Sequence, residues 1–207
     1  MNRFDRRSRL LAAALAALAG YVDAIGFLTL GGFFTSFMSG NSTRLAIGIA
    51  NQTSAAPLAA GLISTFVIGV VAGSYVGVRA KVHRARMVLA FVALLLAVAA
   101  AFGIAGSTKG ATIAMVLAMG AENAVFERDG EVVGLTYMTG TLVKLGQRLT
   151  TTLLGGPRFA WAPYLLLWLG LVSGAVTGAL VFPLLGLGAL WPAAAAALGF
   201  AVIASRI

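Results

Sequence analysis

Two acidic residues lie within apolar stretches of this chain, where a carboxylate is costly unless it is paired or protonated. Asp23 is in the middle of the apolar segment 10–30, and Glu122 is near the end of the segment 110–126, followed directly by Asn123. Ionisable residues in such segments commonly line solute pathways or relay protons. We therefore expect Asp23, Glu122 and Asn123 to bind a solute, with Asp23 as the strongest candidate.

Two short polar segments, each followed by a cation, could complete a binding site with these acids. In both, a run of Ser, Thr, Asn and Gly residues (39–41 and 139–141) precedes a helix-like stretch, with Arg44 or Lys144 about one turn further on. Such residues begin helices, and the free N–H groups of a helix start attract anionic groups. The candidate binding residues in the two segments are Ser39, Gly40, Asn41, Arg44, Thr139, Gly140, Thr141 and Lys144.

The charged candidates also have purely structural alternatives. Arg44 and Lys144 could extend to the lipid headgroups along their long apolar stems. Asp23 could form a buried ion pair with Arg44, or it could cap a helix break near Gly20 or Gly26. The sequence leaves these alternatives open.

The composition indicates a membrane protein. Of the 207 residues, 60% are hydrophobic and 10% are charged, against roughly 45–50% and 25% in average proteins. The predicted fold is an all-α membrane protein with a single integral membrane domain over residues 1–207. It has six transmembrane helices, each long enough to cross the bilayer, and two re-entrant or discontinuous helical segments at 33–52 and 134–154. The six predicted spans are Leu10–Leu30, Ala56–Val78, Met87–Gly106, Gly110–Phe126, Ala160–Phe182 and Leu184–Ser205.

The basic residues predict the orientation. They fall between the apolar segments instead of along one face, which is typical of cytoplasmic loops and argues against a nucleic-acid partner. If residues 79–86 share the cytoplasmic side with the N-terminus, only two full crossings separate them. All but two of the 15 Lys and Arg residues, Arg44 and Lys109, are then cytoplasmic. We expect a multi-pass protein of the bacterial inner (cytoplasmic) membrane, with both termini in the cytoplasm.

The two halves of the chain match at an offset of 100 residues. Each half has three predicted crossings, an odd number, so the second half must enter the membrane from the opposite side. We therefore predict two inverted structural repeats, about 10–106 and about 110–205. An acid in one half opposite an amide in the other would suit proton coupling. The most informative pairs are Asp23/Asn123, Phe37/Tyr137, Ser39/Thr139 and Arg44/Lys144.

Both halves carry a ladder of glycines four residues apart. A stripe of small residues lets two membrane helices approach closely, either within one chain or between two copies. The simplest arrangement packs the two ladder helices against each other, and a homodimer through either ladder is the other possibility. The ladders are Gly69, Gly73 and Gly77 in the first half and Gly170, Gly174 and Gly178 in the second.

Residue patterns for enzymatic or cofactor chemistry are missing. The chain has no Cys, and its single histidine, His83, lies in the basic stretch 79–86, so no His or Cys metal site is expected. The acidic segment 127–131 is interpreted as a solvated turn, because its carboxylates lack the spacing of a calcium loop. No common nucleotide-binding or hydrolase motif occurs. We expect no enzymatic activity and no cofactor.

Residues 20–27 (GYVDAIGF) followed by residues 37–45 (FMSGNSTRL) resemble the YoaK-type family of small bacterial inner-membrane proteins, which is defined by a domain of unknown function. The resemblance covers nearly the whole chain. It implies a six-span membrane protein and supplies no substrate or catalytic residue.

These features predict a secondary transporter or facilitator of a small solute, which could be anionic, across the bacterial inner membrane. The expected partners are the lipid bilayer and an unknown small solute. The alternative is a non-transporting protein that organises lipids or interacts with other membrane components. In that case the glycine ladders mediate assembly and the charges only join helices.

Overall fold

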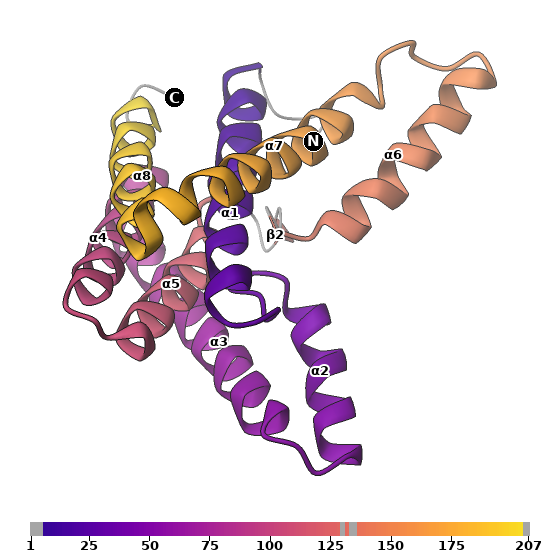
Figure 1. Ribbon diagram of the computed structural model, residues 1–207. Helices are drawn as coiled ribbons and strands as arrows, with labels where there is room; N and C mark the ends of the chain where they lie inside the picture. The colour runs from indigo at the N-terminus through magenta and orange to yellow at the C-terminus, as the bar shows by residue number, and fades with distance from the viewer. Residues whose placement is uncertain (1–5, 129–130, 133–135, 205–207) are drawn as a thin grey trace.

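Eight α-helices make up most of the structure, a computed structural model that describes residues 6–128, 131–132 and 136–204 (Figure 1). The helices are α1 (Arg6–Thr29), α2 (Met38–Ala50), α3 (Ala55–Ala80), α4 (Arg84–Ile104), α5 (Thr108–Glu122), α6 (Met138–Leu153), α7 (Ala162–Leu185) and α8 (Leu190–Ala204). Short 3-10 helices, Lys81–His83 and Gly186–Ala189, join α3 to α4 and α7 to α8.

The apolar helices have the length that a membrane requires. Three uninterrupted helical stretches are long and apolar enough to cross a bilayer, namely Ser8–Thr29, Ala55–Ile104 and Ala162–Ala204. The second stretch contains α3 and α4, and the third contains α7 and α8. Each of the six segments predicted to span mainly overlaps one helix, so the prediction of a helical membrane protein is confirmed at this level. The helix α5, with 15 residues, is not part of the three stretches.

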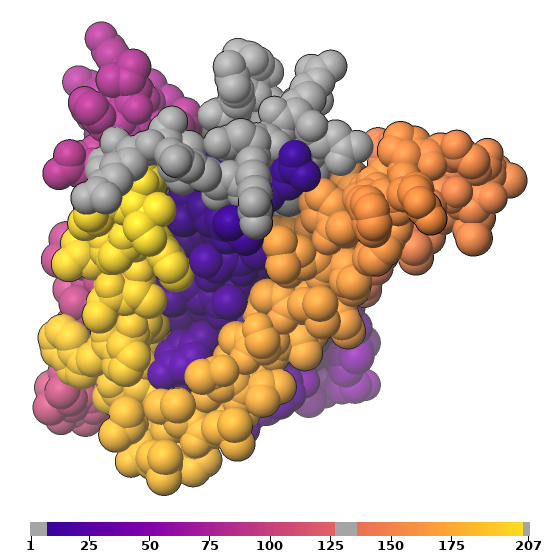
Figure 2. All heavy atoms as spheres, turned by 90° about the horizontal axis from the view of Figure 1, so that it is seen from above, coloured from indigo at the N-terminus to yellow at the C-terminus, as the bar shows by residue number. Residues whose placement is uncertain are grey.

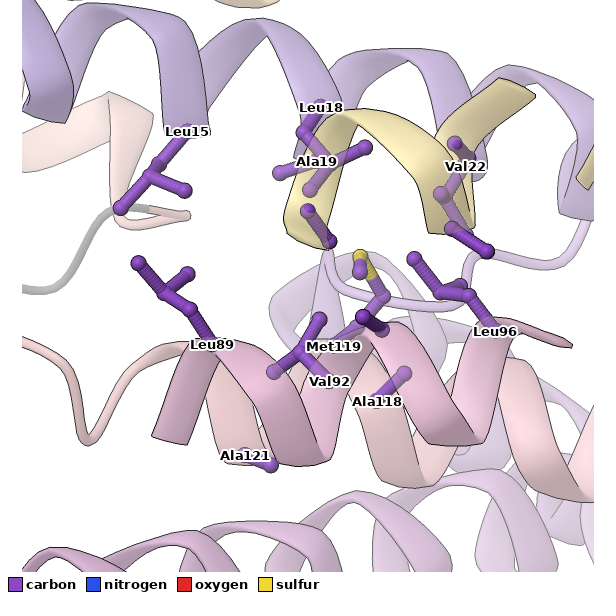
Figure 3. Packing of buried hydrophobic residues seen from close by; sticks show 14 of the residues in the cluster. Leu15, Leu18, Ala19, Val22, Leu89, Val92, Leu96, Ala118, Met119 and Ala121 are labelled. Carbon is purple, nitrogen blue, oxygen red and sulfur yellow. The ribbon is translucent and has the colours of Figure 1, made fainter. Parts of the chain in front are cut away.

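The buried core lies where α1, α4 and α5 meet. Leu15 and Val22 of α1 face Leu89 and Leu96 of α4, and Met119 of α5 lies between the two helices (Figure 3). All five side chains are fully buried. Residues seven positions apart lie on the same face of a helix, so each pair forms part of one continuous contact stripe. This packing holds the acid-bearing helices α1 and α5 in one bundle.

Every fourth residue in the central part of α7 is a glycine that lies against the backbone of α1. A Cβ atom on Gly178 would lie 2.5 Å from the carbonyl oxygen of Tyr21, which is too close for any real side chain. The absence of a side chain is therefore what lets the two backbones touch. The contacts along this line are Gly170 with Ala13, Gly174 with Ala17 and Gly178 with Tyr21.

The glycine ladder of α3 packs against α5 in the same way. A Cβ on Gly73 would lie 2.7 Å from the Cα atom of Ala121, and one on Gly69 would meet the backbone of Leu117. The prediction that the two ladder helices pack on each other is wrong. Each ladder instead packs against the first helix of the other half, α3 on α5 and α7 on α1.

Both ladders are used within one chain. Gly77, the last glycine of the first ladder, faces the side chain of Arg84 of α4, so all six ladder positions have an intramolecular neighbour. A homodimer through either ladder would have to displace these contacts. The glycines explain helix packing inside the chain and leave the expected dimer surface occupied.

The two shorter polar segments form helices that begin earlier than predicted. The residue before α2 is Phe37 and the residue before α6 is Tyr137, and no side chain caps either helix. Ser39 and Asn41 therefore lie inside the first turn of α2 and do not cap it. In Figure 1, α2 lies alongside α3, and α6 projects from the end of α7.

One short antiparallel ladder departs from the predicted all-α fold. Strand β1 (Glu127–Arg128) pairs with β2 (Glu131–Val132), in the register Glu127 to Val132 and Arg128 to Glu131. The sequence between them is Asp-Gly, a pair that favours hairpin turns. The predicted turn covers residues 127–131. Residues 127–128 and 131 of this range belong to the two strands, and residues 129–130 lie outside the described residues.

Candidate functional site

The Asp23 carboxylate binds the loop between α1 and α2. Oδ1 accepts hydrogen bonds from the backbone N–H groups of Thr35 and Ser36, each at 2.7 Å, and from the Thr35 hydroxyl at 2.8 Å. Oδ2 accepts one from the Ser36 hydroxyl at 2.5 Å. Both Thr35 and Ser36 are buried. Asp23 therefore accepts hydrogen bonds from loop donors that are buried away from water. This structural role is neither the ion pair with Arg44 nor the helix cap considered above.

The loop can reach Asp23 because its backbone reverses at two glycines. Gly31 and Gly32 have φ angles of +62° and +103°, a region that residues with a side chain rarely adopt. Asn41 of α2 fixes the same loop from the other side. Its side-chain oxygen accepts from the Phe34 N–H at 3.1 Å, and its amide nitrogen donates to the Phe34 carbonyl at 2.8 Å. Asn41 is fully buried, so this pairing places the start of α2.

Asn123 has a corresponding partner in the second half. The hydroxyl of Thr136 donates to the Asn123 side-chain oxygen at 3.2 Å, and the Asn123 amide nitrogen donates to the Met119 carbonyl at 2.9 Å. Thr136 is 100 residues after Ser36, and Asn123 is 100 residues after Asp23. One hydrogen bond of the first half thus recurs in the second, between a hydroxyl and an amide.

Glu122 is the unusual group of the core. It is fully buried, and neither carboxylate oxygen has a hydrogen-bond partner. A charge on Asp23 lies near enough to act on it electrostatically. Buried acids are normally paired or hydrogen-bonded. The structure therefore brings Asp23 and Glu122 into one electrostatic environment, with Asp23 fully hydrogen-bonded and Glu122 without donors.

Within the described residues, no ion pair joins Arg44 or Lys144 to these acids. The Arg44 guanidinium is 4.9 Å from the ring centroid of Phe33, beside Gly32. A cation over an aromatic face is a favourable contact in itself. Lys144 is exposed on α6, a helix that packs against α7.

The remaining candidates serve their own helices. Ser39 and Thr139 are exposed, and the Thr141 hydroxyl donates to the Tyr137 carbonyl at 3.2 Å. Gly40 and Gly140 lie under the rings of Phe37 and Tyr137. The eleven predicted site residues thus divide into two acids, two asparagines that hold loops, five residues at the helix starts and two cations. Across the described part of the chain, no group of three His, Asp or Glu side chains could hold a metal ion.

Sequence reasoning missed Thr35 and Ser36 as partners of Asp23. A signal was present, because Ser36 and Thr136 begin the matched segments of the two halves. Hydroxyl residues beside a glycine pair are common in loops, however. Only the fold shows that the loop turns back so that these residues donate hydrogen bonds to Asp23 of α1.

A groove that the sequence did not indicate opens between α1, α7 and α8. Its volume is about 290 Å³, and Figure 2 shows α1 at the bottom of a gap between α7 and α8. The Tyr21 hydroxyl donates to the Ala189 carbonyl at 2.8 Å and bridges α1 to the turn before α8. The lining is mainly apolar, with three hydroxyl groups. The lining residues are Ala14, Ala17, Leu18, Tyr21, Ser173, Gly174, Thr177, Pro192, Ala193, Ala196 and Phe200.

A helical bundle that contains three stretches long and apolar enough to cross a bilayer is typical of a membrane protein. The chain belongs to the family described as "Protein of unknown function (DUF1275)", whose model matches residues 11–203. It is similar to the "UPF0700 transmembrane protein RA0705" of Rhizobium meliloti (strain 1021), with 38% identity over 199 residues, covering 95% of this chain and 86% of that protein. No solved structure matches the chain. The expectation of a membrane-protein family of unknown function is confirmed, and the narrower YoaK-type assignment stays a prediction.

Proposed function

We propose that this protein is a secondary transporter or facilitator of a small solute across the bacterial inner membrane, and not an enzyme. The observation that carries the proposal is a difference between two equivalent helix triplets. The groove between α1, α7 and α8 is open, whereas in the triplet α5, α3 and α4 the helices α3 and α4 pack on each other and on α5. Carriers expose a central site to one side of the membrane at a time, and such an asymmetry between related halves is what that cycle requires.

The equivalence of the triplets rests on proposed inverted repeats at about 10–106 and 110–205. Two findings support these repeats. The glycine ladder of each half packs on the first helix of the other half. The bond from Ser36 to Asp23 recurs as the bond from Thr136 to Asn123. The predicted register also pairs α1 with α5, α3 with α7 and α4 with α8.

Two of the four α1 residues that line the groove differ in burial from the residues 100 positions later. Ala14 and Tyr21 are partly exposed in the groove. Ala114 and Ala121, which are 100 residues later, are buried where α5 meets α4 and α3. The anionic character of the solute stays a prediction, because the N–H groups that Asp23 accepts, those of Thr35 and Ser36, precede the first turn of α2.

The proposal is tested by solute-dependent stabilisation of the purified protein. Thermal unfolding is measured with a panel of inorganic anions, organic acids and neutral metabolites. A solute that binds the folded protein raises its stability in a saturable way. We expect stabilisation by one chemical class, abolished by Ala196→Trp, which fills the groove. Ala195→Trp makes the same change at the adjacent, exposed position of α8 and should keep the effect.

The same screen separates the alternative function. The groove is mainly apolar, so a lipid chain could also occupy it. If only lipids stabilise the protein, and the soluble panel has no effect, the non-transporting, lipid-organising function is favoured over transport.

The proposed topology predicts which loops a membrane-impermeant thiol reagent can reach. Residues 1–5 and 205–207 lie outside the described residues, so the labels are placed at His83, between α3 and α4, and at Lys109, at the start of α5. In this Cys-free chain, Lys109→Cys should react in intact cells, and His83→Cys should react only after the membrane is opened. Labelling of His83→Cys from outside would show that α2 crosses fully and would remove the inverted arrangement.

A further inference from the structure

Glu122 is the one carboxyl in the described core whose oxygens have no donor, and it is fully buried. An ionised carboxylate in such a place has neither water nor a hydrogen bond to stabilise its charge. The neutral acid removes the charge and needs less solvation. Full burial without a partner therefore selects the protonated form.

Asp23 has the opposite environment. Two of the three donors to its Oδ1 are backbone N–H groups, from Thr35 and Ser36. A backbone N–H can only donate, so Oδ1 is an acceptor. A proton on Asp23 would have to lie on Oδ2, where it would replace the hydrogen bond donated by the Ser36 hydroxyl. Two negative carboxylates within electrostatic reach of one another repel, which favours one proton on the pair. Asp23 has four hydrogen-bond donors and Glu122 has none, so the charge is better stabilised on Asp23 and the proton is favoured on Glu122.

We propose that Glu122 is a proton-binding site, with Asp23 as its fixed negative partner, and that its proton exchanges during the transport cycle. In the exchange an O–H bond forms or breaks on a carboxyl oxygen of Glu122, and its charge changes between 0 and −1. The proton is taken from water on one side of the membrane and released to water on the other. The exchange during the cycle rests on the proposed transport function, whereas the bound proton does not.

The charged neighbours are consistent with this assignment. From α4, the Nε of Arg84 donates to the Ala124 carbonyl at 2.9 Å, at the end of α5, and its side chain covers Gly77. From α3, the nearest charge along the helix, Arg79, lies over the Tyr75 ring with 5.2 Å to the centroid. From α1, the charge that acts on Glu122 is Asp23.

Infrared difference spectroscopy on the purified full chain tests the bound proton directly. Near neutral pH we expect the C=O stretching band of one protonated carboxylic acid per chain, shifted by deuterium exchange. Glu122→Gln should abolish the band, and Asp23→Asn, which retains the side-chain acceptor, should leave it in place. A wild-type protein without the band, or a folded Glu122→Gln protein that keeps it, would overturn the proposal.

A second measurement tests the proposal without replacing Glu122, in case the Glu122→Gln protein does not fold. The chain has six acidic residues, and Glu127 and Glu131 are the other two glutamates. Carboxyl-¹³C glutamate in the double variant Glu127→Gln/Glu131→Gln labels Glu122 alone, and the band should shift by the isotope effect. An unshifted band belongs to another acid and would sink the proposal. The band is measured without any solute, so its absence and a failure to find a solute are separate results.

Discussion

Replacement of Gly174 by Leu is expected to lower the free energy of unfolding by about 3 kcal/mol, at the upper end of overpacking effects. Even the first carbon of the new side chain would overlap the carbonyl oxygen of Ala17 on α1. The contact is with backbone, which cannot rotate away, so α7 and α1 would have to separate along their length. Thermal or denaturant unfolding in detergent measures the loss, and we expect accompanying aggregation.

Gly61→Leu is the matched control on a membrane helix. Gly61 lies in α3, and nothing is within 4 Å of a Cβ atom placed there. The same substitution should leave stability nearly unchanged at this site. If Gly174→Leu and Gly61→Leu behave alike, the close packing of α7 on α1 does not exist in the membrane.

Asp23→Leu is expected to destabilise the protein by about 2–6 kcal/mol. The estimate assigns about 1–3 kcal/mol to each buried donor left without an acceptor, and the two backbone N–H groups of Thr35 and Ser36 would both be orphaned. Their hydroxyls can rotate to other acceptors, so they are not counted. The loop that begins α2 should loosen, with faster hydrogen exchange at these two amides as the local measurement.

Asp23→Asn separates the hydrogen bonds from the charge. Asparagine keeps one side-chain oxygen to accept from Thr35 and Ser36, and it is the residue that the second half has at position 123. This variant should fold with a loss well below that of Asp23→Leu. Equal losses for Asn and Leu would mean that the charge, and not the acceptor geometry, stabilises the loop.

The helices could be read from the sequence because each depends on a local property. Apolar runs long enough to cross a bilayer must form helices, since only helices satisfy all backbone groups within the segment. The six predicted spans therefore coincide with α1, α3, α4, α5, α7 and α8. Helix starts were less accurate, since Asn41 was assigned to a cap and instead pairs with Phe34.

The sequence also placed Asp23 and Glu122 in apolar segments and, through the match at an offset of 100 residues, related Asp23 to Asn123. It did not show what each acid contacts. The donors to Asp23 lie 12 and 13 residues away across a chain reversal. Glu122 lacks donors because none of the elements packed around it places an N–H or O–H group at its carboxyl oxygens. Spacing along one helix cannot encode either fact.

The sequence by itself determined the class of protein, the approximate helices and the small-residue stripes on them. Only the tertiary structure decided that α3 packs on α5 and α7 on α1, that α1, α7 and α8 enclose an open groove, and that Glu122 is buried without a partner. The physical reason is that in lipid an apolar side chain gains no hydrophobic free energy by moving from contact with acyl chains to contact with another helix. Hydrophobic pattern then marks what lies in the membrane, and close steric fit between particular residues selects the neighbours.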